Sequence, residues 1–107
     1  MYEKTFALMF SIEEKNAVVT GGSNLDRLVW FMTGYAYAEL EETGKQISFI
    51  HYFGEYALNQ MRINVERARG WQYYLKKKYP SEPEAIKEFY RLLHTFYSDL
   101  SVGNIKY

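Results

Sequence analysis

Hydrophobic residues recur every three or four positions over most of this chain, which is the period of an α-helix. Residues 24–43 show the pattern over their whole length. Ser23 or Asn24 precedes the stretch as an N-cap residue, and Asp26 adds negative charge to the first turn. We therefore predict a helix over 24–43, with its main apolar side formed by Leu25, Leu28, Val29, Met32, Ala36 and Leu40.

Two further helices follow from the same spacing. Residues 48–79 contain no proline, which predicts either one long helix or two helices broken near 63–64, where Asn64 falls on the apolar side. Ser81, Pro83 and Glu84 form a helix start with a capping box, so the next helix should span 82–100. We therefore expect a mainly α fold, a single-domain helical bundle of about three long helices.

The N-terminal stretch shows a different period. Apolar residues alternate with smaller or polar ones, which is typical of a strand. A second short run of β-prone residues follows at 17–20. The pattern predicts an N-terminal β-hairpin over about 5–20, with a helix over 4–14 as the alternative. The alternating residues are Phe6, Leu8, Phe10 and Ile12.

Composition narrows the class of protein. A chain of 107 residues implies one domain, 1–107, and 48% hydrophobic with 24% charged residues is an ordinary globular balance. The absence of cysteine excludes disulfide frameworks, thiolate zinc sites and cysteine nucleophiles. The N-terminus does not match a signal peptide, and no apolar run reaches the roughly 20 residues of a membrane span. We therefore expect a cytoplasmic protein.

A glycine-containing turn precedes the first predicted helix. The sequence AVVTGGSN at 17–24 resembles the nucleotide-binding turn of short-chain dehydrogenases at Thr20 and Gly21. That family requires further glycines where this chain has Leu25 and Arg27, whose side chains block the approach of a pyrophosphate. No cofactor is therefore predicted.

The helix over 24–43 also carries aromatic residues opposite its main apolar side. Trp30 and Tyr37 lie there, with Glu39, Glu41 and Glu42 close by. Aromatic anchors beside acidic groups are typical of a docking surface for a basic protein. The alternative is that another part of the chain covers Trp30 and Tyr37, in which case they belong to the core.

A basic segment follows at 62–78. Basic side chains can bind phosphates and aromatic rings can stack on bases, so the combination is typical of nucleic-acid binding. The alternative is a solvated helix end, where the helix dipole favours cations. The basic residues are Arg62, Arg67, Arg69, Lys76, Lys77 and Lys78, interleaved with Trp71, Tyr73 and Tyr74.

His51 and Glu55 stand four positions apart in the predicted helix over 48–79. At this spacing the carboxylate could orient the imidazole for base catalysis, or both could bind one metal ion. One histidine and one glutamate do not complete a metal site, and the alternative is a solvated pair. We predict no catalytic residue and no metal site.

Charge is distributed unevenly along the chain. Residues 1–60 contain four basic and eight acidic residues, for a net charge of −4, whereas residues 61–107 contain nine and five, for +4. Aromatic residues make up 19% of the chain, with 11 tyrosines, which suits interfaces. We expect a non-catalytic protein-binding domain, most concretely an immunity- or antitoxin-type inhibitor that blocks a toxic enzyme such as a nuclease. The alternative is a small nucleic-acid-binding module that uses 62–78. The sequence leaves the oligomeric state open.

Overall fold

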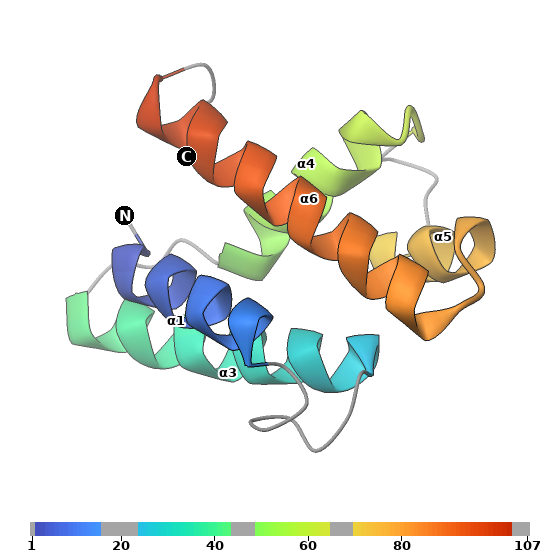
Figure 1. Ribbon diagram of the computed structural model, residues 1–107. Coiled ribbons are helices and arrows are strands. Elements are labelled where there is room, and N and C mark those ends of the chain that lie inside the picture. The colour runs from blue at the N-terminus through green and yellow to red at the C-terminus, as the bar shows by residue number, and fades with distance from the viewer. Residues whose placement is uncertain (1, 16–23, 44–48, 65–69, 104–107) are drawn as a thin grey trace. The chain divides into compact units, whose positions relative to one another are not determined.

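The computed structural model describes residues 2–15, 24–43, 49–64 and 70–103. Every regular element in these ranges is an α-helix, as expected for a mainly α fold (Figure 1). The chain divides into two compact units, Met1–Ile50 and His51–Tyr107, so whether it forms one domain stays a prediction. The helices are α1 (Glu3–Glu14), α3 (Leu25–Thr43), α4 (Phe49–Gln60), α5 (Trp71–Lys78) and α6 (Glu82–Ser101).

The predicted β-hairpin over 5–20 is wrong where the structure describes it, because residues 3–14 form helix α1. The alternative, a helix over 4–14, is correct. The buried positions of α1 are spaced by one, three and three residues, which is a helical period. They are Thr5, Phe6, Met9 and Ile12. The remainder of the predicted hairpin, 16–20, lies outside the described residues.

Helix α1 runs antiparallel to α3 (Figure 1), and a side chain from α3 caps the N-terminus of α1. Tyr2 occupies the N-cap position but provides no side-chain hydrogen bond to the helix. Instead, the carboxylate of Glu39 accepts hydrogen bonds from the backbone N–H of Lys4 at 3.0 Å and of Thr5 at 2.9 Å. It also accepts one from the Thr5 hydroxyl at 2.6 Å. These bonds satisfy backbone groups that a helix start leaves without a partner.

Aromatic packing joins the start of α4 to α1 within the first unit. The ring of Phe49 makes edge-to-face contacts with Tyr2, at 5.0 Å between centroids, and with Phe6, at 5.4 Å. All three side chains are buried. This geometry is the one that aromatic pairs prefer, so it adds to the stabilisation that burial provides.

Helix α3 confirms the predicted helix over 24–43. The side chain of Asn24 accepts a hydrogen bond from the backbone N–H of Arg27 at 3.1 Å, which is the predicted N-cap interaction. Leu25, Leu28 and Met32, on the predicted apolar side, are completely buried. The apolar residues of the main side of α3 are therefore buried, and the aromatic residues opposite them lie on its exposed side.

The predicted bundle of about three long helices is wrong in the described ranges, because 48–79 is not one long helix. The alternative, a break near 63–64, is correct. Helix α4 ends at Gln60, and Arg62 adopts a left-handed backbone with φ of 60°. The N–H of Arg62 bonds to the carbonyl of Asn59, and the N–H of Ile63 bonds to the carbonyl of Leu58. This pair of bonds is a Schellman motif, which ends a helix by satisfying its last carbonyl groups.

The second unit has an aromatic core contributed by α4, α5 and α6. The ring of Phe53 lies 5.2 Å from Trp71, 5.9 Å from Phe89 and 5.4 Å from Phe96. Gly54 makes room for this cluster, because a Cβ atom at that position would lie 3.0 Å from the indole of Trp71. Trp71 is therefore a core residue and not a surface one.

Helix α6 confirms the predicted helix over 82–100 to within one residue. Ser81 is at the N-cap and Pro83 is in the first turn, as expected. The Ser81 side chain forms no capping hydrogen bond, so this part of the predicted capping box is wrong. No helix in the described ranges is both long and apolar enough to cross a membrane.

Candidate protein-binding site

Helix α3 exposes large aromatic side chains on the side opposite its buried residues. Trp30 is 76% exposed and Tyr37 is 63% exposed, while Phe31 and Tyr35 are 42% and 37% exposed. The name "α3 aromatic face" is used below for all exposed residues of this side. They are Arg27, Trp30, Phe31, Gly34, Tyr35, Tyr37, Ala38 and Glu41.

The helical period explains why these residues share one side. At about 100° per residue they fall within an arc of roughly 160°, centred near Gly34. Leu28 and Met32 lie outside that arc and are completely buried. A methyl group at Gly34 would have no neighbouring atom within 4 Å outside the backbone of its own helix. The centre of the face is therefore low, with aromatic rings on both flanks.

The structure separates the acidic residues that the sequence placed together. Glu39 is only 8% exposed, and its carboxylate caps α1, so it does not lie on the α3 aromatic face. Glu41 does lie on this face. The side chain of Glu42 is outside the described residues. The face therefore combines one acidic residue with one basic residue, Arg27, which the sequence analysis did not include.

The four exposed aromatic side chains of α3 together present a sizeable apolar area. A fully buried aromatic side chain removes about 150–250 Å² from water, so the exposed parts of these four amount to roughly 300–500 Å². That is the size of the largest apolar patch on a typical monomer, and such patches are often functional. Tryptophan, tyrosine and arginine are also the residues most enriched among energetically important interface contacts.

The structure describes the predicted nucleic-acid segment at residues 62–64 and 70–78. Arg62 has the left-handed backbone that ends α4, and Arg67 and Arg69 lie outside the described residues. Lys77 and Lys78 are exposed at the end of α5, and Lys76 is half-buried. The ammonium of Lys77 lies 5.9 Å from the centre of the Tyr73 ring. The lysines therefore have the surroundings of a solvated helix end.

The aromatic residues of this segment also differ in exposure. Trp71 is 6% exposed and stacks on Phe89 at 5.9 Å between centroids, with 14° between the ring planes. It cannot stack on a nucleic-acid base without leaving the core. Tyr73 is 40% exposed and Tyr74 is half-buried. Tyr73 is thus the aromatic side chain of this segment with the most accessible ring.

His51 and Glu55 form a pair on the surface of α4. The Nε2 atom of His51 lies 3.3 Å from Oε1 of Glu55, and the two side chains are 64% and 43% exposed. A pair with this exposure is surrounded by water, which weakens its interaction and its ability to polarise a substrate. Among the described residues, no group of three or more potential ligands could hold a metal ion.

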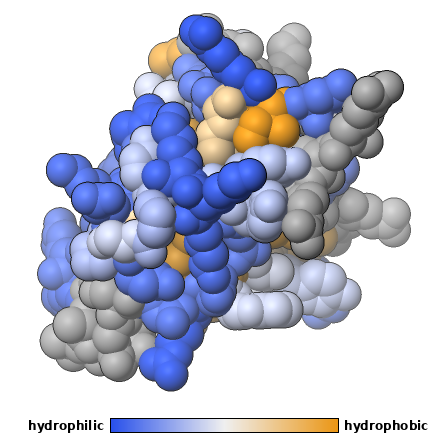
Figure 2. Space-filling view, turned by 90° about the vertical axis from the view of Figure 1, so that its right-hand side faces the viewer, coloured by the Kyte–Doolittle hydropathy of each residue, from blue (hydrophilic) through white to orange (hydrophobic). Residues whose placement is uncertain are grey.

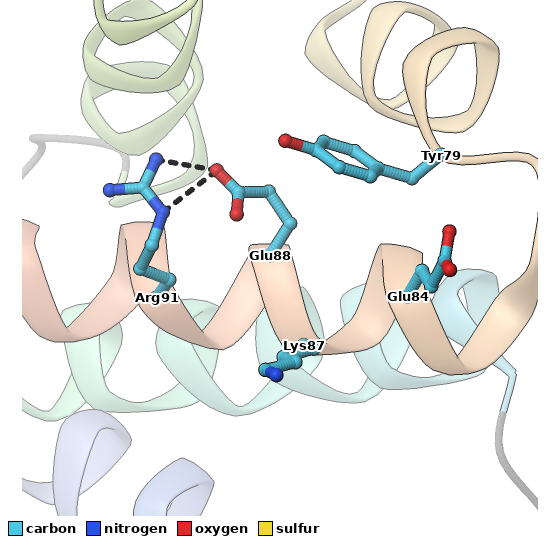
Figure 3. Close-up of a pocket in the computed structure, with 5 residues that line it drawn as sticks. All are labelled: Tyr79, Glu84, Lys87, Glu88 and Arg91. Carbon is cyan, nitrogen blue, oxygen red and sulfur yellow. Dashed lines mark hydrogen bonds and ion pairs between the residues drawn. The ribbon is translucent and has the colours of Figure 1, made fainter.

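A shallow hollow of about 340 Å³ lies beside α6 and was not indicated by the sequence. Figure 3 shows Tyr79 above α6, with its hydroxyl directed toward Glu88. Glu88 accepts a hydrogen bond from Nε of Arg91 at 2.8 Å, and this bond raises the pKa of Arg91. The hollow is lined by Tyr79, Glu84, Lys87, Glu88 and Arg91. Its acidic and basic groups balance, so it attracts neither anions nor cations strongly.

Figure 2 shows the hydropathy of one face of the molecule. On the face shown in Figure 2, hydrophilic residues predominate and strongly hydrophobic residues occupy small, separate areas.

Comparisons of this chain with protein-family models, with curated proteins and with solved structures gave no significant match. The residues themselves therefore supply the basis for a functional proposal.

Proposed function

We propose that this chain is a non-catalytic protein-binding domain and that the α3 aromatic face is its interface. One observation carries the proposal: Trp30 and Tyr37 are mostly exposed, while Leu25, Leu28 and Met32 on the opposite side of the same helix are completely buried. An exposed tryptophan leaves the surface of the largest apolar side chain in contact with water. A partner that covers it would gain the free energy of burial without changing the fold of α3.

The most concrete form of this function is an immunity- or antitoxin-type inhibitor that occludes a toxic enzyme such as a nuclease. The support is the charge of the segment that carries the face. Residues 1–60 have a net charge of −4, and the α3 aromatic face carries Glu41 together with Arg27. A nuclease that binds a polyanion is basic around its active site, so opposite charges would accelerate the encounter. Aromatic anchors would then hold the complex together.

A second candidate is a small nucleic-acid-binding module that uses 62–78. It is favoured by the exposure of Lys77 and Lys78 at the end of α5 and by the partly exposed ring of Tyr73. It ranks second because Trp71, one of the three aromatic residues of the segment, packs in the core. One aromatic ring fewer than the sequence predicted is thus available for base stacking, while Arg62, Lys77 and Lys78 are exposed.

Affinity capture from the native cell tests the proposal. The full chain is immobilised and retained molecules are identified by mass spectrometry, in parallel with Trp30→Ala and with Tyr97→Ala, a control on α6 where Tyr97 is 41% exposed. The proposal predicts a protein that is retained by the wild type and by Tyr97→Ala but lost from Trp30→Ala. A basic nuclease would support the inhibitor form. Retention of bulk RNA in place of a protein would favour the second candidate.

A further inference from the structure

The α3 aromatic face is arranged symmetrically around its central residue. Arg27 and Glu41 lie near its two ends, each seven positions from Gly34. At a rise of 1.5 Å per residue, each charge is about 10 Å along the helix from the centre. Trp30 and Ala38 are likewise four positions from Gly34 on either side. A basic end therefore mirrors an acidic end about one glycine.

We propose that this face pairs with the same face of a second copy of the chain, with the two α3 helices antiparallel and a two-fold axis at Gly34. This inference rests on the proposed function, because it takes the α3 aromatic face as a protein-binding surface, and it names a second copy as a partner. In a two-fold interface each residue meets the position that mirrors it. Arg27 of each copy then faces Glu41 of the other.

Charge selects the antiparallel arrangement over the parallel one. If the helices ran parallel in register, Arg27 would face Arg27 of the second copy and Glu41 would face Glu41. Like charges in an interface are unfavourable, whereas the antiparallel arrangement forms two opposite-charge pairs. The antiparallel arrangement also aligns the two helix dipoles in opposite directions, which is their favourable orientation.

Side-chain size is complementary in the same arrangement. The two Gly34 residues meet at the axis, where the absence of side chains lets the helices approach closely. Trp30 and Tyr37 lie on the same flank of the face, so Trp30 of one copy comes level with Tyr37 of the other. Phe31 and Ala38 lie on the opposite flank, so Phe31 of one copy comes level with Ala38 of the other. There a large side chain meets a small one.

The area of the face limits how strong this pairing is. The exposed aromatic surface of roughly 300–500 Å² per copy gives roughly 600–1,000 Å² for two copies. With the charged ends added, the total is near the lower limit for specific interfaces, about 1,000–1,200 Å². We therefore expect a weak, reversible dimer.

Analytical ultracentrifugation of the full chain from about 1 µM to about 1 mM tests this inference, with charge-reversal variants. Arg27→Glu and Glu41→Arg should each weaken dimerisation at least about tenfold, because each places like charges opposite one another. The double variant should restore the wild-type dissociation constant. Glu14→Lys, an exposed change on α1, is the control and should have no effect. Circular dichroism verifies that each variant keeps its helices.

Two results would overturn the pairing. One is a wild-type chain that stays monomeric over the whole range, and the other is a double variant that remains as weak as the single ones. Neither result affects the proposed function, because loss of a captured protein from Trp30→Ala would still show that the α3 aromatic face binds a partner. Conversely, a dimer that obeys the charge swap, together with no protein lost from Trp30→Ala, would leave the pairing standing and contradict the inhibitor.

Discussion

Thr5 donates two hydrogen bonds to the carboxylate of Glu39, one from its backbone N–H at 2.9 Å and one from its hydroxyl at 2.6 Å. The two residues are 34 positions apart, and Thr5 is completely buried. Through these bonds α3 supplies the cap that α1 lacks in its own sequence. Glu39, which we predicted from the sequence to lie on a binding surface, therefore stabilises the fold.

This relationship predicts that Glu39→Ala lowers the free energy of unfolding by roughly 2–4 kcal/mol, because it removes a cap and leaves buried donors without an acceptor. Glu41→Ala, on the exposed side of the same helix, is the matched control and should stay within about 0.5 kcal/mol of the wild type. Urea denaturation of both variants measures the difference. Equal stabilities would contradict the capping role of Glu39.

Two helical glycines should respond to alanine in opposite directions. Gly34→Ala should stabilise the chain by roughly 0.5–1 kcal/mol, because alanine favours the helix and the added methyl group has open space. In Gly54→Ala the methyl group would lie 3.0 Å from Trp71, whose ring is held by Phe53 and Phe89. Overpacking of this kind costs about 1–3 kcal/mol, which exceeds the gain in helix propensity.

Thermal or chemical denaturation of the two glycine variants, at a concentration low enough to keep the chain monomeric, provides the measurement. If Gly54→Ala were as stable as Gly34→Ala, the indole of Trp71 would have to move freely. The core of the second unit would then differ from the one described above.

Tyr56 links α4 to α6, since its hydroxyl donates a hydrogen bond to Oδ2 of Asp99 at 2.7 Å. Burial, followed by this hydrogen bond and the negative charge of Asp99, raises the pKa of Tyr56 well above its ordinary value of 10.0. The unfolded chain therefore loses this proton first as the pH rises. The stabilisation from Tyr56 is complete below about pH 10 and is lost progressively above it.

Tyr56→Phe should lower the free energy of unfolding by roughly 1–2 kcal/mol at neutral pH. The gap between wild type and variant should narrow above pH 10, because phenylalanine has no proton to lose. Denaturation curves at several pH values check this, with Tyr97→Phe as an exposed control. A gap that widens with pH would show that Tyr56 is not held in its neutral form.

The sequence predicted those features of the fold that are determined by residues within a few positions of one another. The bounds of α3 and α6 followed from apolar spacing and from residues at the helix starts, which act within a few positions. The hairpin error arose because Phe6, Leu8, Phe10 and Ile12 alternate by coincidence. The feature that supports α1 as a helix, the carboxylate of Glu39, lies too far along the chain for a local pattern to show.

For the candidate site, the position of its residues on the helix was predictable, but their exposure was not. Trp30 and Tyr37 were correctly placed opposite the main apolar side of their helix, since helical geometry alone determines that position. Whether they are exposed depends on tertiary packing, which a sequence pattern does not contain. A break near 63–64 was predicted as one alternative, but the left-handed backbone of Arg62 was not, because a left-handed helix terminus is usually occupied by glycine and here is occupied by arginine.

The second candidate function gives a further prediction. We expect the wild-type chain to bind RNA or DNA no more tightly than non-specific binding. The triple variant Lys76→Glu, Lys77→Glu, Lys78→Glu should bind no more tightly either. The reason is that Trp71 is in the core and cannot stack on a base. Fluorescence anisotropy with labelled RNA at several salt concentrations measures it. A nanomolar, salt-sensitive complex that the triple variant abolishes would place nucleic-acid binding first.

The central claim is that the α3 aromatic face binds a protein, and the most direct test is the affinity of a captured partner for Trp30→Ala. The variant should fold with nearly wild-type stability, because its side chain is 76% exposed. Its affinity for the partner should fall by about 2 kcal/mol or more, roughly thirtyfold, as happens when an interface anchor is truncated. Unchanged affinity in a folded Trp30→Ala would contradict the claim.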